Sequence, residues 1–377
     1  MAMHERKMAK DPAYLYSSSR KGTHTPTPKS LYQYLAIVIR VFAQQKAPKE
    51  NVNKAKRSRR SNFAESIEHF RGIVEELDGG VPGVSLFELL WAKFHFDRED
   101  EAILSSQFQE AVESLGQFVA GDEKLFKWTG ESQWVRVCPQ KEDEVGLWNY
   151  ELVGQLPNDL GFLLYVKSHT CETVLGGGIQ CAAVVRDWGR IVKDKGTENA
   201  TILTCDSYYL DLTGRDILLE LEVLYLCALQ SCRFNTLYRR ANIISHHAGK
   251  TALLYSEELH EMFVTHWYPP PLNRKFVLTN ALIASPGSTR KAIIPGCDHF
   301  SVMFNLCDKY NRRLHDKSWP HRCMTAELQE HNFLFTCLLT NCYNAFLNSK
   351  HQTPHDLDYQ TFGEELADDL FFYACSL

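Results

Sequence analysis

The stretch that decides the fold is FVAGDEKLFKW, residues 118–128, because the sequence changes there from helical patterns to short stranded ones. Three similar runs follow it: QWVRVCP (133–139), LWNYELVG (147–154) and GFLLYVKS (161–168). Each run is rich in aromatic and β-branched residues, and turns separate the runs, which is typical of strands. We therefore predict an antiparallel meander of three or four strands.

Beyond the meander, the pattern alternates between helix and strand. The stretch GGGIQCAAVVRDWGRIVKDKG (176–196) has apolar residues at helical spacing and predicts a helix. The β-branched run ATILTC (200–205) predicts a buried strand that ends at Asp206. Strands first, then alternating helix and strand, indicate a mixed α/β sheet.

The next helix and strand complete this pattern. We expect Thr213 to cap a helix over residues 214–221, and YLCALQSC (225–232) to be a further strand. Before the sheet, we expect a short apolar helix over residues 31–44 and an amphipathic helix over residues 102–115.

Composition excludes several classes of protein. The chain has 377 residues, of which 44% are hydrophobic and 23% charged, so it is neither collagen-like nor disordered throughout. No apolar run reaches the roughly 18 residues of a membrane span. The first residues, MAMHERKMAKD, lack the apolar core of a secretory signal, so we expect a soluble intracellular protein.

Charge is distributed unevenly along the chain. The net charge is −5, yet residues 1–60 carry 14 Lys and Arg against three acidic residues. A basic arm on an acidic body suggests nucleic-acid binding or nuclear import. A solvated linker is an equally good interpretation of the same arm.

Three aspartates stand at informative places in the predicted layout. Asp122 lies in the first strand, Asp206 ends the strand after the first long helix, and Asp298 begins a late helix. Carboxylates at these places of a mixed sheet are how a ribonuclease-H-like fold builds a two-metal site. Two Mg²⁺ ions about 4 Å apart need bridging oxygen ligands. Spacing alone equally fits three surface carboxylates.

The residues around these aspartates resemble the sequence blocks of piggyBac-type DDE transposases. GDEKLFKWTG (121–130) is similar to the family's DE-x-L-x-x-F-x-G block, TILTCD (201–206) to its second strand, and PGCD (295–298) to its GGVD block. LLTNCYNA (338–345) is similar to the family's helix that ends in NAY. FELLWAKFHFD (87–97) is similar to the segment before the family's sheet.

The resemblance covers roughly residues 60 to 350 and implies a DNA transposase. Asp122, Asp206 and Asp298 would be the catalytic residues and would ligate Mg²⁺ (or Mn²⁺). Water and then a DNA 3′-hydroxyl would attack phosphodiester bonds. The resemblance further implies binding to transposon ends or target DNA, a homodimer and a nuclear location, without any membrane.

Other residues would contact DNA if the resemblance holds. Cationic side chains near the sheet would bind phosphates, and a tryptophan would stack on a base or wedge a strand end. These residues are Arg136, Lys141, Arg312, Arg313, Lys317 and Trp319. Trp319 fits an ordinary core position equally well.

The resemblance also implies a division of the chain. We expect a disordered basic arm (1–60), a helical subdomain (61–116), the first part of a ribonuclease-H-like catalytic core (117–239), a β-rich insertion (240–290), the last part of the core (291–350) and an acidic tail (351–377).

The chain departs from the family's pattern at three points, and other functions stay open. Ser207 stands where the family usually has Asn, and Ser301 where a further Asp is common. We expect a shortened chain without the family's C-terminal cysteine-rich zinc domain. An inactive nuclear DNA- or chromatin-binding protein on the same fold is the main alternative. An intracellular protein whose acidic body binds other proteins is the third.

Overall fold

The computed structural model describes only part of the chain. The described residues are 17–19, 22–24, 28–44, 64–72, 96, 98–113, 115–128, 130–138, 145–169, 177–196, 201–206, 208–228, 239, 251–256, 261–266, 275–280, 305–311, 325–351 and 357–377. Two compact units are present. One comprises Met1–Leu104, Phe126–Leu147 and Arg312–Leu377, and the other comprises Ser105–Leu125 and Trp148–Asn311.

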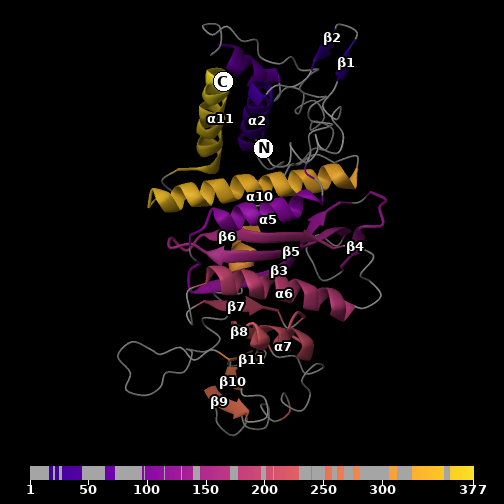
Figure 1. Ribbon diagram of the computed structural model, residues 1–377, viewed down its shortest axis with the longest axis vertical. Helices are drawn as coiled ribbons and strands as arrows, with labels where there is room; N and C mark the ends of the chain where they lie inside the picture. The colour runs from indigo at the N-terminus through magenta and orange to yellow at the C-terminus, as the bar shows by residue number, and fades with distance from the viewer. Residues whose placement is uncertain are drawn as a thin grey trace, which may run out of the picture. The chain divides into compact units, whose positions relative to one another are not determined.

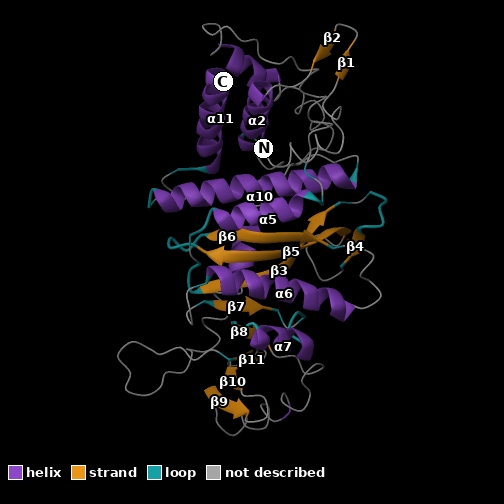
Figure 2. Cartoon of the chain, in the orientation of Figure 1, coloured by secondary structure: helices purple, strands orange, loops and turns teal. Residues whose placement is uncertain are grey.

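One mixed sheet carries most of the described strands. They are β3 (Phe118–Lys127), β4 (Val135–Val137), β5 (Val145–Gln155), β6 (Gly161–Ser168), β7 (Ile202–Cys205), β8 (Leu224–Ala228), β9 (Thr251–Ser256), β10 (Glu261–His266) and β11 (Lys275–Thr279). The strand order is β4-β5-β3-β7-β8-β11-β10-β9, and β6 also pairs with β5. Strands β3, β7 and β8 are parallel to one another, whereas the β5–β6 and β8–β11–β10–β9 pairs are antiparallel. The predicted mixed α/β fold is thus confirmed, and four strands lie within residues 118–168, where three or four were expected (Figure 2). The expected meander was wrong, because β5 and not β4 lies next to β3 in the sheet.

Helix α6 (Gly177–Lys195) covers one face of the second unit's sheet (Figure 1). Its apolar residues at helical spacing are buried as predicted, among them Val184, Val185 and Trp188. Lys193 and Lys195 lie in its last turn, where positive charge is favourable for the helix dipole. This helix connects β6 to β7 and so determines where β7 enters the sheet.

Helix α7 (Leu212–Glu220) follows β7, and here the expected cap was wrong. The cap is Asp211, not Thr213, because the Asp211 carboxylate accepts a hydrogen bond from the Gly214 N–H at 2.8 Å. The backbone of Asp211 is extended, as a capping residue requires, whereas Thr213 already lies inside the helix. Aspartate and threonine are both good caps, so composition did not separate them.

The other unit contains four of the described helices: α2 (Pro28–Ala43), a helix over residues 64–72, α10 (Ala326–Ser349) and α11 (Tyr359–Ser376). Helix α5 (Asp100–Glu110) begins in this unit and ends in the other. A small two-stranded sheet, β1 (Ser17–Ser19) with β2 (Gly22–His24), is separate from the large one.

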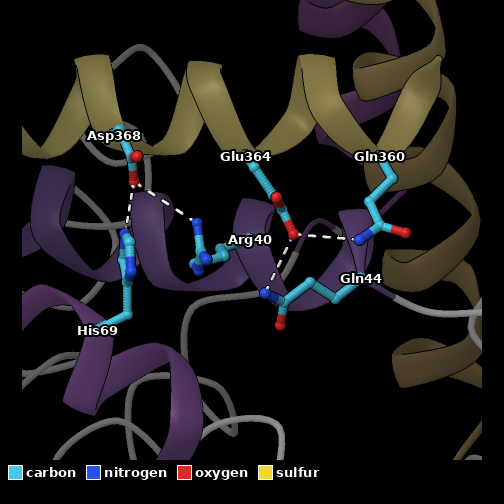
Figure 3. A network of polar contacts seen from close by, with 6 residues as sticks. All are labelled: Arg40, Gln44, His69, Gln360, Glu364 and Asp368. Carbon is cyan, nitrogen blue, oxygen red and sulfur yellow. Dashed lines mark hydrogen bonds and ion pairs between the residues drawn. The ribbon is translucent and has the colours of Figure 1, made fainter.

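Helices α2 and α11 lie side by side although they are far apart in the sequence (Figure 1). The Phe70 ring, from the helix over 64–72, stacks on Phe371 of α11 with centroids 4.3 Å apart. A polar network joins side chains of α11 to Arg40, Gln44 and His69 (Figure 3). In it, Asp368 Oδ1 lies 2.9 Å from His69 Nε2 and 3.6 Å from Arg40 Nη1.

Candidate functional site

The pairing of β3 with β7 brings two of the three predicted aspartates together. The two strands are parallel, and their last paired residues are Gly121 and Cys205. One residue further along each strand stand Asp122 and Asp206. Neighbouring strands lie about 4.8 Å apart, so the backbones of these two residues lie side by side where β7 ends. Sequence reasoning placed both at strand positions, but the pairing itself comes from the structure.

Asp122 is held in place by local backbone geometry. Its side chain is 9% exposed, and Oδ1 accepts a hydrogen bond from the Glu123 N–H at 2.8 Å. Since successive side chains of a strand point to opposite faces, Asp122 faces away from its neighbours Gly121 and Glu123. A carboxylate fixed by its own strand needs little further ordering to act as a ligand.

The face that bears Gly121 and Glu123 packs against α6. A Cβ at Gly121 would lie only 2.4 Å from the Trp188 ring, so only glycine fits there. On the same face, the Tyr209 hydroxyl donates a short hydrogen bond to Glu123 Oε2. Burial raises the pKa of Tyr209 well above its usual value, and the nearby Glu123 and Asp122 carboxylates raise it further. The phenol therefore keeps its proton and stays a donor.

The face that bears Asp122 contains the helix over residues 305–311. From this helix, Cys307 Sγ donates to the Ala120 carbonyl at 3.2 Å. Burial raises the pKa of the Cys307 thiol, and the carboxylates of Asp122 and then Glu151 add to the shift. Glu151, on β5, is fully buried. This face therefore gathers carboxylates around a neutral thiol.

Most of the other predicted site residues lie outside the described residues. They are the third aspartate, Asp298, and the proposed DNA contacts Lys141, Arg312, Arg313, Lys317 and Trp319. Arg136 is described and lies on β4. Its Nη1 donates to the carbonyls of Gln133 at 3.3 Å and Val135 at 3.1 Å, so part of its guanidinium is engaged with its own turn.

Two of the three predicted metal ligands, Asp122 and Asp206, are among the described residues. Within them, no group of three or more His, Cys, Asp or Glu side chains is arranged to hold a metal ion. Asp122 and Asp206 offer carboxylate oxygens, the ligands that Mg²⁺ and Mn²⁺ prefer, so the pair fits such an ion chemically. The third predicted ligand is not among the described residues.

Among the helices of the described residues, none has the length and apolar character to cross a membrane.

Four residues near the aspartates escaped the sequence analysis as site residues: Glu123, Glu151, Tyr209 and Cys307. Glu123 stood beside Asp122 in the quoted block, so its position was visible although its contact was not. Nothing in the sequence marked Glu151 as a site residue, because the run LWNYELVG is typical of an ordinary strand. The Tyr209–Glu123 contact joins residues 86 positions apart, which a local pattern does not encode.

Comparison with known proteins found a similarity in structure. No protein-family model matches the sequence, and no curated protein matches it. A cryo-EM structure of piggyBac transposase in a synaptic complex with hairpin DNA is similar in fold, with a TM-score of 0.58. The match covers 98% of this chain and 76% of that chain, at 11% sequence identity. At this identity the likeness is one of fold.

Proposed function

We propose that this chain is a piggyBac-like DNA transposase, or a domesticated derivative of one, that cleaves and joins DNA strands. The observation that carries the proposal is the placement of Asp122 and Asp206 one residue beyond the last pair of two adjacent parallel strands. The fold likeness to piggyBac transposase supports the same function. The protein in that comparison is in a complex with hairpin DNA, and we propose DNA as the substrate here.

The fold proposed for the core is ribonuclease-H-like. A mixed sheet with one aspartate within a strand and a second at the end of the neighbouring parallel strand supports this assignment. The helix α6 between β6 and β7 supports it too, because it brings β7 back parallel to β3. Rigid strands hold carboxylates in place better than loops do.

In the proposed site, Asp122, Asp206 and Asp298 hold Mg²⁺ or Mn²⁺. Such ions would lower the pKa of a bound water or DNA 3′-hydroxyl and stabilise the leaving oxygen of the phosphodiester. The chain's own contribution is to fix the carboxylates before the metal arrives. The hydrogen bond from the Glu123 N–H to Asp122 Oδ1 does this for the first of them.

DNA contacts outside the carboxylates are proposed for cationic and aromatic residues. Arg136 lies on β4, and we propose that its guanidinium binds a DNA phosphate. We propose the same role for Lys141, Arg312, Arg313 and Lys317, and base stacking for Trp319. A nuclear location and a homodimer belong to the same proposal.

The test is strand nicking of a fluorescent DNA duplex in the presence of Mn²⁺. Asp122→Asn and Asp206→Asn keep the side-chain volume but remove the negative charge. In Asp122→Asn the amide oxygen still accepts the Glu123 N–H, so folding is expected to be preserved. We expect each variant to lose more nicking rate than the roughly 10–100-fold that loss of a partner behind a metal ligand costs.

The matched control is Asp194→Asn, which removes an exposed carboxylate of α6. It should nick like wild type, and EDTA should abolish nicking in both. Equal nicking by wild type, Asp122→Asn and Asp206→Asn would contradict the assigned carboxylates. DNA binding by the wild type without any nicking would favour an inactive DNA- or chromatin-binding protein on the same fold.

A further inference from the structure

Tyr209 connects the two strands that carry the aspartates. It ends a tight turn after β7, in which its N–H donates to the Asp206 carbonyl at 3.0 Å. Its hydroxyl donates to Glu123 Oε2 on β3. One residue thus bonds to Asp206 itself and to the immediate neighbour of Asp122.

The bond between Tyr209 and Glu123 and the Asp122 carboxylate lie on opposite faces of β3. Glu123 and Asp122 are consecutive in the strand, so their side chains point to opposite faces. Glu123 accepts the bond from Tyr209 on the α6 face, which leaves the Asp122 carboxylate on the other face. The connection therefore acts from behind the carboxylates and does not occupy their oxygens.

The Tyr209 ring has little freedom to move. It is 1% exposed, and its centroid lies 4.8 Å from that of Trp188 and 6.2 Å from that of Tyr150. Trp188 in turn lies against Gly121, directly before Asp122. A hydroxyl held by a buried ring gives a bond of defined direction, so the turn after β7 is fixed relative to β3.

We infer that Tyr209 is a positioning residue that sets the Asp206 carboxylate against the Asp122 carboxylate through its bonds to Glu123 and to the Asp206 backbone. The inference rests on the proposed function, because it takes the two aspartates to be metal ligands. A tyrosine that only filled the core would affect stability alone. A positioning tyrosine also affects the affinity of the site for a divalent cation.

The experiment measures Mn²⁺ binding to the full chain by isothermal titration calorimetry, well below the unfolding temperature of each variant. Tyr209→Phe removes the hydroxyl and keeps the ring packing. We expect Mn²⁺ affinity to fall about 10-fold, the lower end of the usual loss for partners behind metal ligands. The matched control is Tyr208→Phe at the adjacent, 41% exposed tyrosine, for which we expect less than about a 2-fold change.

A second variant keeps the inference testable if Tyr209→Phe does not fold. Glu123→Ala removes the other end of the same bond and should weaken Mn²⁺ binding by a similar factor. The double variant should bind within about 2-fold of the weaker single variant, because both changes remove one interaction. Fully additive losses would overturn the inference.

Asp122→Asn and Asp206→Asn separate failure of the inference from failure of the proposed function. If these two lose Mn²⁺ binding while Tyr209→Phe and Glu123→Ala bind like wild type, the positioning role is wrong and the ligands stand. If Asp122→Asn and Asp206→Asn bind Mn²⁺ like wild type, the assigned ligands are wrong and the inference falls with them.

Discussion

Asp122 and Asp368 both lie beside other polar groups, and the two differ in the groups that hold them. At the end of β3, Asp122 is held by a hydrogen bond from the next backbone N–H and by the pairing of its strand with β7. In the unit that contains α2 and α11, Asp368 of α11 is held by the side chains of Arg40 and His69 (Figure 3).

The difference concerns the freedom left to each carboxylate. The Glu123 N–H bonds to Asp122 Oδ1 at a position that is 9% exposed. Asp368 is 34% exposed and is held by the side chains of Arg40 and His69, and ion pairs between partly exposed groups contribute little. Under the proposed function the first arrangement would suit ligand binding, whereas the second borders an apolar helix contact. The predictions below test this contrast.

The largest effect is expected from the apolar contact that the Asp368 network borders. Phe371 is fully buried and stacks on Phe70, so Phe371→Ala should lower the free energy of unfolding by about 3–5 kcal/mol. Denaturant unfolding followed by circular dichroism measures this. Phe372→Ala, at the next position of α11 but 50% exposed, should cost less than about 1 kcal/mol. Equal losses in the two variants would show that packing does not hold this helix.

A smaller effect is expected where the sheet needs glycine. The Cβ of Gly121→Ala would meet the buried Trp188 ring at 2.4 Å, and that ring has no room to withdraw. Such overpacking should cost about 1–3 kcal/mol in the same unfolding experiment. The matched change in the unit that contains α2 and α11 is Gly72→Ala, whose Cβ would meet nothing within 4 Å. It should be neutral or stabilise by up to about 1 kcal/mol. A neutral Gly121→Ala would mean that α6 is not fixed against β3.

The contrast also explains which features the sequence predicted. The helix over residues 177–195 and the strand before Asp206 were predicted because their apolar patterns are local and strongly periodic. The position of Asp122 within a strand followed from the same kind of pattern. Local patterns reflect which face of an element is buried, and in this chain that was enough for the fold class.

Local patterns did not predict which distant segments pair with one another. Nothing local states that Gly121 pairs with Cys205, since register depends on the whole sheet. Helix α2 lies near the start of the chain and α11 near its end, and the two associate. From the sequence we predicted only an apolar helix for the first and an acidic tail for the second. The acidic residues Glu364 and Asp368 instead accept contacts from Gln44, Arg40 and His69. Tertiary packing decided these features.

The smallest effect is expected from the Asp368 network itself. Asp368→Asn keeps the shape and removes the charge that faces Arg40 and His69, so it should cost about 0.5–1.5 kcal/mol in unfolding free energy. The control is Asp369→Asn, an exposed carboxylate at the next position of α11, expected within about 0.5 kcal/mol of wild type.

Salt distinguishes an electrostatic origin of this loss from a steric one. Raising the ionic strength from about 0.1 M to 1 M shortens the screening length from about 10 Å to 3 Å. The difference between Asp368→Asn and wild type should therefore shrink, because most of the lost interaction is between partly exposed charges. Mn²⁺ binding should stay unchanged in Asp368→Asn, since the network only borders a helix contact. A loss above about 3 kcal/mol that persists in salt would place Asp368 with Asp122 as a rigidly held carboxylate, and the contrast between the two regions would fail.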